Sequence, residues 1–453
     1  MVVADAAGRT RPSSALVPTL AQLAVGTVAA FPLAVVFALA LSANPPPLQL
    51  VLVGGIGALL VLALVLTKIE VAVGLGILLL GVVRLEPAPT DFILGTVVAV
   101  ALVTGRFSLG RVPQSIFLLV GAYLALNIVS AAVAIDFPLA VSFGLITLYL
   151  AGFAIWLTSF VNSTKRARLV AGAYVYGAAA VAVLGTLALW VSPLASAGFD
   201  PDFYRAQSSF QDPNVFGHFL IPAMLIVLDE LLTPRILPGG RVLKLALLAA
   251  TLIGIVFSYS RSAWAGAVLG AFIVFAVHIT RRGGTSGAPK ILALAALAIV
   301  AISFTITSTG TGEFIDERAQ LQRYDSDRFA TQRAGLELAA SNPLGVGPGQ
   351  FENHLRIAAH STYVRAVAEH GVLGLVTLVA LMLLTLLIAA RNAIFGRHTY
   401  GIGSGALFAS WFAIVFASFV IDTIHWRHLW LVAGLIWAGS LRPRSQGEGL
   451  RGT

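Results

Sequence analysis

The chain has 453 residues, of which 58% are hydrophobic and only 11% are charged, and its formal net charge is +9. This composition excludes a soluble globular protein of the same length and indicates a polytopic membrane protein. Unbroken apolar runs of about 20 residues predict transmembrane helices, because the backbone must satisfy its own hydrogen bonds in hydrocarbon. We therefore expect an all-α integral membrane protein with a single membrane domain over 1–453, without a soluble domain or an internal repeat.

The apolar runs predict about 12–14 transmembrane helices. They lie at 17–42, 48–67, 69–83, 92–104, 113–134, 139–160, 169–191, 214–232, 243–258, 263–280, 290–307, 362–390, 401–421 and 428–441. The runs 69–83 and 92–104 are shorter than the usual crossing length of roughly 17 residues, which leaves the count between 12 and 14. The chain has no cysteine, which excludes disulfides, thiolate metal ligands and a cysteine nucleophile.

Basic residues are distributed unevenly between the two predicted sides. With a cytoplasmic N-terminus, the inside segments hold 19 of the 29 basic residues but only 5 of the 20 acidic ones. Because cytoplasmic loops collect Lys and Arg, this asymmetry predicts that both termini are cytoplasmic. The positive net charge therefore follows from topology and gives no reason to expect a nucleic-acid partner.

A long polar segment at 308–361 interrupts the apolar runs, and we expect it to be an extracytoplasmic loop that contains short helices. Arg328 and Arg333 lie on a predicted amphipathic helix that runs to Ala340. An Asn-Pro-Leu-Gly-Val-Gly-Pro-Gly stretch at 342–349 then predicts a tight turn that returns the chain to the membrane. His360 closes the segment.

Two other outer segments carry an arginine at the membrane surface. Arg205 precedes Asp212 and Asn214. A functional role for these two residues and a simple role in a solvated loop, where they form a turn and cap the next helix, are about equally favoured. Arg261 lies in a very short turn, and a charged side chain there usually faces a polar cavity or an anionic ligand. The alternative is that its guanidinium group extends to the membrane interface. An arginine in either place can bind a phosphate through two hydrogen bonds.

His360 is a candidate general base. A lone histidine at an interface is more often a structural hydrogen-bonding residue, but a site lined by Arg205 and Arg261 would hold the pKa of His360 down. A neutral imidazole suits a base that acts on a sugar hydroxyl. The last outer turn adds Asp422, His425 and Arg427 as candidates at the same depth.

Four motifs in this order resemble the O-antigen ligase and polymerase superfamily, over roughly residues 200–440. They are Arg205 with Asp212-Pro213-Asn214, Ser260-Arg261-Ser262, the glycine-rich stretch at 342–349, and His-Ser-Thr-Tyr leading to Glu-His-Gly-Val-Leu-Gly at 360–374. The family most often has His-Asn where this chain has His360-Ser361, which puts the role of Ser361 in question.

The resemblance implies a multi-pass glycosyltransferase of the bacterial cytoplasmic (inner) membrane that works in cell-envelope biogenesis. Such an enzyme transfers a glycan from a polyprenyl-diphosphate carrier, such as undecaprenyl diphosphate, to an acceptor glycan or glycolipid on the extracytoplasmic face. No cofactor and no metal are implied, and the anomeric centre would be inverted. His360 and Arg261 would be catalytic, and Arg205, Arg261 and Arg333 would bind the donor diphosphate. The supporting residues would be Asp212, Asn214, Tyr363, Glu369, Asp422, His425 and Arg427.

The chemistry agrees with these residues, since loss of a lipid diphosphate requires positive charge on the developing anion, which two arginines can supply. The main alternative is a flippase for lipid-linked oligosaccharides or another polytopic transporter, and a structural membrane protein is a second. Transporters tend to place charge and broken helices at the bilayer midplane. Here the polar candidates gather on one face, which favours the enzyme. Ligase and polysaccharide polymerase stay equally open.

Overall fold

The computed structural model describes residues 48–84, 87–191, 193–195, 199–200, 205–282 and 323–440. The expected spans 17–42 and 290–307, and the first part of the expected loop 308–361, lie outside these residues. The described residues are mainly helical, with a short antiparallel pair formed by β1 (Phe199–Asp200) and β2 (Arg205–Ala206). The prediction of an all-α fold is confirmed.

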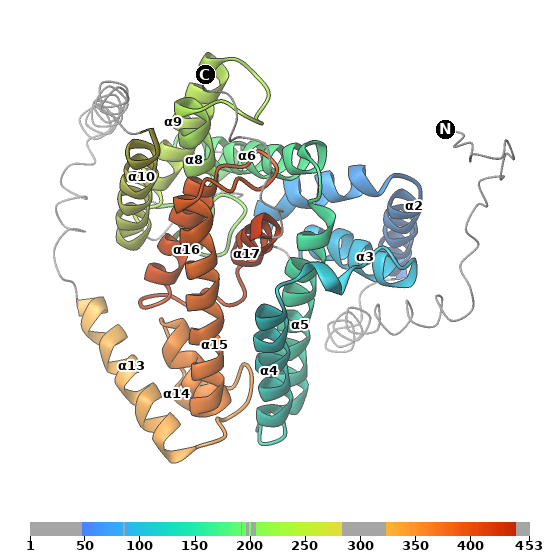
Figure 1. The fold of residues 1–453 in the computed structure, drawn as a ribbon. Coiled ribbons are helices and arrows are strands. Elements are labelled where there is room, and N and C mark those ends of the chain that lie inside the picture. Colours follow the sequence, from blue (N-terminus) through green and yellow to red (C-terminus); the bar gives the residue numbers. More distant parts are fainter. Residues whose placement is uncertain are drawn as a thin grey trace, which may run out of the picture.

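The helices pack into one elongated bundle (Figure 1). In chain order they are α2 (Leu48–Leu78), α3 (Pro89–Val103), α4 (Gln114–Ala131), α5 (Phe137–Phe160), α6 (Thr164–Leu187), α8 (Pro213–Leu232), α9 (Arg241–Phe257), α10 (Arg261–Arg282), α13 (Arg323–Ser341), α14 (Phe351–Leu355), α15 (Thr362–Ile394), α16 (Ser404–Ala417) and α17 (Arg427–Ser440), with 3₁₀ turns η1 (Leu79–Gly81) and η2 (Leu109–Arg111). Among the described residues, seven helices are long and apolar enough to cross a membrane, and α3 and α16 are shorter apolar helices. The chain is thus a polytopic membrane protein.

Helix α2 bends at Lys68, whose φ and ψ of −141° and 58° are not helical. The bend coincides with the predicted boundary between the runs 48–67 and 69–83. Figure 1 shows the two arms of α2 at an angle to each other. The second arm packs against α3, where the Thr90 hydroxyl donates to the Gly76 carbonyl at 2.8 Å. The short run predicted at 92–104 corresponds to α3.

Helix α8 forms the centre of the bundle. Nearly all of its residues are buried, and it contacts α6, α9, α10 and α16. A helix that is apolar on all sides belongs in such a position, because every face can then be covered by other helices. Its first turn is capped by Asp212, whose side chain accepts a hydrogen bond from the Asn214 amide at 2.7 Å. The central helix therefore begins at one of the sequence motifs.

Helix α15 breaks at Gly371, which has φ 68° and ψ −175°. A Cβ added at Gly374 would lie 2.2 Å from the Cβ of His370 and 3.5 Å from the carbonyl oxygen of Ala366. Ala366 and Gly374 are eight positions apart, and in a straight helix such residues are separated by about 12 Å along the axis. Residues 362–370 therefore form a separate short arm that turns against the start of the long arm, 372–394. The span predicted at 362–390 corresponds to the candidate membrane span Thr362–Ile394, and the break divides it near its start.

Helix α13 confirms the helix predicted through Arg328 and Arg333. It lies along the outer side of α14 and α15 (Figure 1). Gly335 allows the close approach, since a Cβ there would lie 2.6 Å from a methyl carbon of Val364 on the short arm. Phe329 and Leu336 of α13 are exposed. The helix therefore covers the segment that follows His360.

Candidate functional site

The structure brings Arg205, Asp212 and Asn214 together at the start of α8. Arg205 is 8% exposed. Its Nε donates to the Ser258 carbonyl at 2.8 Å, and its Nη2 donates to Asn214 Oδ1 at 2.9 Å. Asp212 Oδ1 in turn accepts from Asn214 Nδ2 at 3.0 Å. The acceptors in these two bonds are neutral oxygens, and the bonds orient the guanidinium.

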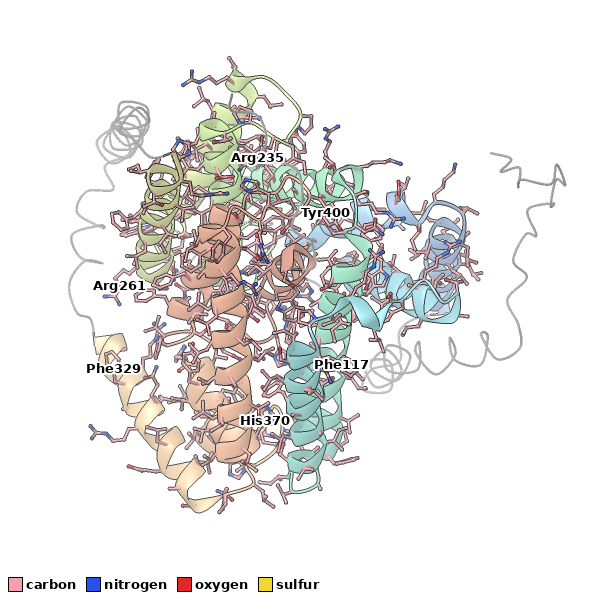
Figure 2. The ribbon with its side chains drawn as sticks, viewed as in Figure 1. Phe117, Arg235, Arg261, Phe329, His370 and Tyr400 are labelled. Carbon is pink, nitrogen blue, oxygen red and sulfur yellow. The ribbon has the colours of Figure 1, made fainter. Side chains whose placement is uncertain are left out.

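Arg261 is the first residue of α10 and is partly exposed. Figure 2 shows it at the lower end of α10, on the side of the molecule where α13 lies. Ser258 ends α9 three residues earlier, so the turn that presents Arg261 also binds Arg205 through its carbonyl. Two of the three arginines predicted to bind the donor, Arg205 and Arg261, are thus attached to one short connection between helices, whereas Arg333 lies on α13.

His360 is half-buried and has a left-handed backbone conformation, with φ 48°. Its carbonyl accepts a hydrogen bond from Gln332 Nε2 of α13 at 3.0 Å. The same amide donates to the Phe419 carbonyl at 3.2 Å. A left-handed conformation costs a residue with a side chain roughly 1–3 kcal/mol unless its surroundings stabilise it. The bond from Gln332 therefore helps to hold the backbone of His360 in this conformation.

Charged groups around His360 act on its pKa. Burial lowers the pKa of His360 most, and the Arg328 cation lowers it further, with a smaller effect in the same direction from Arg365. Asp212 and Glu352 act in the opposite sense. The lowered pKa agrees with the expectation from the sequence, but the cations responsible are Arg328 and Arg365. The influence of Asp212 places His360 near the start of α8.

Arg365, on the short arm of α15, forms an ion-pair cluster that sequence reasoning missed. Its Nη1 donates to Glu352 Oε2 at 3.1 Å and to Glu369 Oε1 at 2.7 Å, and its Nε lies 2.8 Å from Asp422 Oδ2. Its Nη2 also pairs with Glu352. We call this cluster the carboxylate clamp. Two of its members, Glu369 and Asp422, were expected as supporting residues, and the structure brings them to one arginine.

The glycine-rich stretch 342–349 docks on the same arm. The Gly349 amide donates to Glu369 Oε2 at 2.9 Å, and the Gly347 amide donates to the Glu369 carbonyl at 3.0 Å. Gly345, with φ 79°, comes so close that a Cβ would lie 2.3 Å from that carbonyl. Side chains are excluded from this contact, which explains the glycines. The predicted return turn is thus anchored by Glu369.

A small cavity adjoins the carboxylate clamp. It is lined by Tyr123, Asn127, Thr147, Pro348, Thr362, Arg365, Ala366, Glu369, His370, Ile424 and His425. His370 Nδ1 lies 3.1 Å from the Ser130 hydroxyl, and His425 Nε2 lies 3.0 Å from the Thr147 hydroxyl. Burial lowers the pKa of His425 to about 4, so its imidazole is neutral near pH 7. His425 therefore belongs to this cavity.

Two other predicted residues make contacts of their own, and a third is exposed. Arg427 Nε donates to Asp91 Oδ1 of α3 at 2.7 Å, in a pair that ties α17 to α3. The Tyr363 hydroxyl donates to the Val415 carbonyl at 3.1 Å, and Arg333 is exposed on α13. These contacts give Arg427 and Tyr363 clear roles in helix packing. In the part of the chain that the structure describes, no group of three His, Asp or Glu side chains is arranged to bind a metal ion.

Sequence reasoning did not select Arg328, Gln332, Arg365 and Asp91. A signal existed for Arg365, because a charged residue within a predicted span is itself a candidate for function. Its spacing of four residues from Glu369 is also that of a helical ion pair. Gln332 contributes through a side-chain bond to a distant carbonyl, for which the local sequence holds no pattern.

The fold and these contacts define a polytopic all-α membrane protein with arginines and a histidine at the ends of its helices. Residues 246–379 match the profile of the family described as O-antigen ligase. The matched region includes Arg261, the glycine-rich stretch, His360 and the short arm of α15, and it confirms the resemblance to the O-antigen ligase superfamily. The family implies an O-antigen ligase-like membrane glycosyltransferase. No curated protein matches the chain.

Proposed function

We propose that this protein transfers a glycan from a polyprenyl-diphosphate carrier to a hydroxyl of an acceptor sugar, on the extracytoplasmic side of a bacterial cytoplasmic membrane. In this proposal both termini are cytoplasmic. The reaction inverts the anomeric centre and uses no metal ion. The product is either a ligated glycan or an extended polysaccharide, and ligase and polymerase share the same chemistry at the site.

In the proposed reaction, His360 accepts the proton of the acceptor hydroxyl as the oxygen attacks the anomeric carbon. The bond between that carbon and the diphosphate oxygen breaks, and the charge passes to the lipid diphosphate. Arg205 and Arg261 stabilise this anion, because guanidinium groups bind phosphate oxygens through paired hydrogen bonds. Direct displacement inverts the configuration.

The observation that carries the proposal is the position of His360. It lies close enough to Asp212, at the start of α8, and to Arg328, on α13, for both to affect its pKa. Burial and Arg328 together lower that pKa, so the neutral imidazole that a general base requires predominates near pH 7. Asp212 is linked to Arg205 through Asn214. Asp212 thus acts electrostatically on the proposed base and is hydrogen-bonded, through Asn214, to a proposed phosphate-binding arginine.

The break in α15 favours one alternative, a transporter for lipid-linked sugars, because transporters use broken helices to bind their substrates. In this protein, however, Gly349 and Phe351 donate to the Glu369 carboxylate close to the break, and Arg365 pairs with it. The polar groups near the break are therefore paired with one another. This arrangement supports a rigid site over a helix that moves during transport.

The test is a reconstituted transfer assay with purified protein, a polyprenyl-diphosphate oligosaccharide and an acceptor glycan. Arg261→Ala should lose transfer, and His360→Ala should lower kcat by about 10²–10⁴ with little change in donor binding, as expected for removal of a general base. Arg391→Ala is the matched control, since Arg391 is exposed in the last turn of α15. Unchanged transfer by His360→Ala would refute its role. Movement of labelled donor across vesicles without transfer would indicate the transporter.

A further inference from the structure

We propose that Arg365 is a positioning residue for His360, holding the histidine in its working geometry through the carboxylate clamp. The inference rests on the proposed function for the role of His360. Its geometric part stands on the contacts of Arg365 alone.

The carboxylate clamp joins three segments that surround His360. Glu352 comes from α14, which precedes His360 in the chain, and Glu369 comes from the short arm that follows it. Asp422 comes from the turn between α16 and α17. Arg365 is 7% exposed and is the cation common to all three pairs. Loss of its charge would leave three carboxylates close together, and their repulsion would separate the segments.

The chain between His360 and Arg365 is tightly held. Ser361 caps the short arm by accepting a hydrogen bond from the Val364 amide at 3.4 Å. The Thr362 amide donates to the Ser418 carbonyl at 2.9 Å, and the Thr362 hydroxyl accepts from the Thr423 amide at 2.8 Å. Displacement of Arg365 is therefore transmitted along this arm to the left-handed residue at its start.

The turn at 418–426 connects the carboxylate clamp to His360 by a second route. Asp422 of this turn pairs with Arg365, while the Phe419 carbonyl shares the Gln332 amide with the His360 carbonyl. If Asp422 moves, the shared bond at Gln332 is disturbed. His360 is thus fixed from both its neighbours in the chain and the turn across from it.

Four charged groups act on the His360 imidazole from the elements around it. They are Arg328 of α13, Asp212 before α8, Glu352 of α14 and Arg365 of the short arm. Arg365 lowers the pKa of His360, so removing its charge should raise that pKa. If the reaction needs neutral His360, acidification would then begin to lower its rate at a higher pH than in the wild-type protein.

Two substitutions separate position from charge. Arg365→Gln removes both the cation and its fork of donors, whereas Arg365→Lys keeps the charge but cannot reach three carboxylates with one ammonium group. Arg391→Gln, in the last turn of the same helix, is the control for loss of an arginine. For each variant we would measure the folded amount, kcat, KM and the acid limb of the pH profile. The pH dependence of His360 modification by diethylpyrocarbonate, followed by mass spectrometry, needs no substrate.

Both Arg365 variants should lower kcat per folded molecule by about 10²-fold with a nearly unchanged KM, because a displacement of about 1 Å can cost that much. Only Arg365→Gln should move the acid limb, and the modification of His360, to higher pH. An arginine with a purely structural role would lower the folded amount and leave kcat per folded molecule and the acid limb unchanged. That result would overturn the proposal.

Glu352→Gln is a second test for the case in which Arg365→Gln does not fold. The Glu352 side chain is 39% exposed, so this change is mild. Glu352 raises the pKa of His360, so its neutralisation should move the titration of His360 to lower pH and weaken one arm of the carboxylate clamp. An unmoved titration would overturn the proposal. If wild-type protein transfers no glycan while these titration shifts occur, the proposed function fails and the geometric inference stands.

Discussion

Replacement of Gly371 by alanine should destabilise the protein by an amount that can be worked out from the break in α15. Gly371 has φ 68° and ψ −175°, a region that residues with a Cβ avoid at a cost of about 1–3 kcal/mol. The added Cβ would lie 2.2 Å from the Pro343 carbonyl oxygen, where ordinary contact begins at 3.4 Å. Relief of that overlap adds about 1–3 kcal/mol. The expected loss is therefore about 2–6 kcal/mol in total.

The measurement is thermal unfolding of detergent-purified Gly371→Ala, followed by fluorescence-detected size exclusion. At about 1 °C per kcal/mol for a chain of 453 residues, the midpoint should fall by at least about 2 °C. Gly121→Ala is the matched control, because Gly121 lies within α4 and a Cβ there meets nothing within 4 Å. That control should be neutral or slightly stabilised, since alanine favours a helix over glycine. Equal midpoints for the two variants would refute the reasoning from backbone strain.

Three further predictions concern the pair of Arg427 and Asp91, the protonation of His425 and the need for a metal ion. Arg427→Met removes the arginine that pairs with the buried Asp91 carboxylate, and it should lower the free energy of unfolding by about 3–5 kcal/mol in a thermal unfolding assay. The double variant Arg427→Met with Asp91→Leu should recover most of this loss. An equal loss in the single and double variants would argue against the pair. Burial lowers the pKa of His425 to about 4 in the folded protein, against about 6.5 when unfolded, so its contribution to stability is complete above pH 6.5 and is lost as the pH falls toward 4. In His425→Asn the unfolding midpoint should therefore depend less on pH over this window. An unchanged dependence on pH would contradict the assignment. Glycan transfer should survive excess EDTA, and activity that is lost and then restored by magnesium would refute the metal-independent mechanism.

Sequence patterns predicted the features of this protein that depend on local composition. The apolar runs predict most of the helices, and Asp212 and Asn214 form the cap that their residue types suggest. The bend is at Lys68, a charged residue that separates two apolar runs. In each case one short stretch of chain contains the physical cause.

The remaining features depend on residues far apart in the chain. Gly371 lies in a run that is apolar enough to cross a membrane, and glycine is common in such helices, so the break at this position left no distinct signal. The charge of Arg365 within a predicted span was a local signal, but two of its partners, Glu352 and Asp422, are distant in the chain. The partner of Arg427 is 336 residues away, and no local pattern connects the two. The cations near His360 differ from the predicted pair for the same reason, since Arg328 reaches it only through the packing of α13.

The glycine-rich stretch is attached to the short arm of α15 through main-chain atoms. Glu369 binds the amides of Gly349 and Phe351, and the amide of Gly347 binds the Glu369 carbonyl. A main-chain amide is the same in every residue except proline, so this contact places few demands on the segment beyond its glycines. Exposed residues of the segment, such as Leu344, can therefore change while the contacts to Glu369, and the histidine that follows, stay in place.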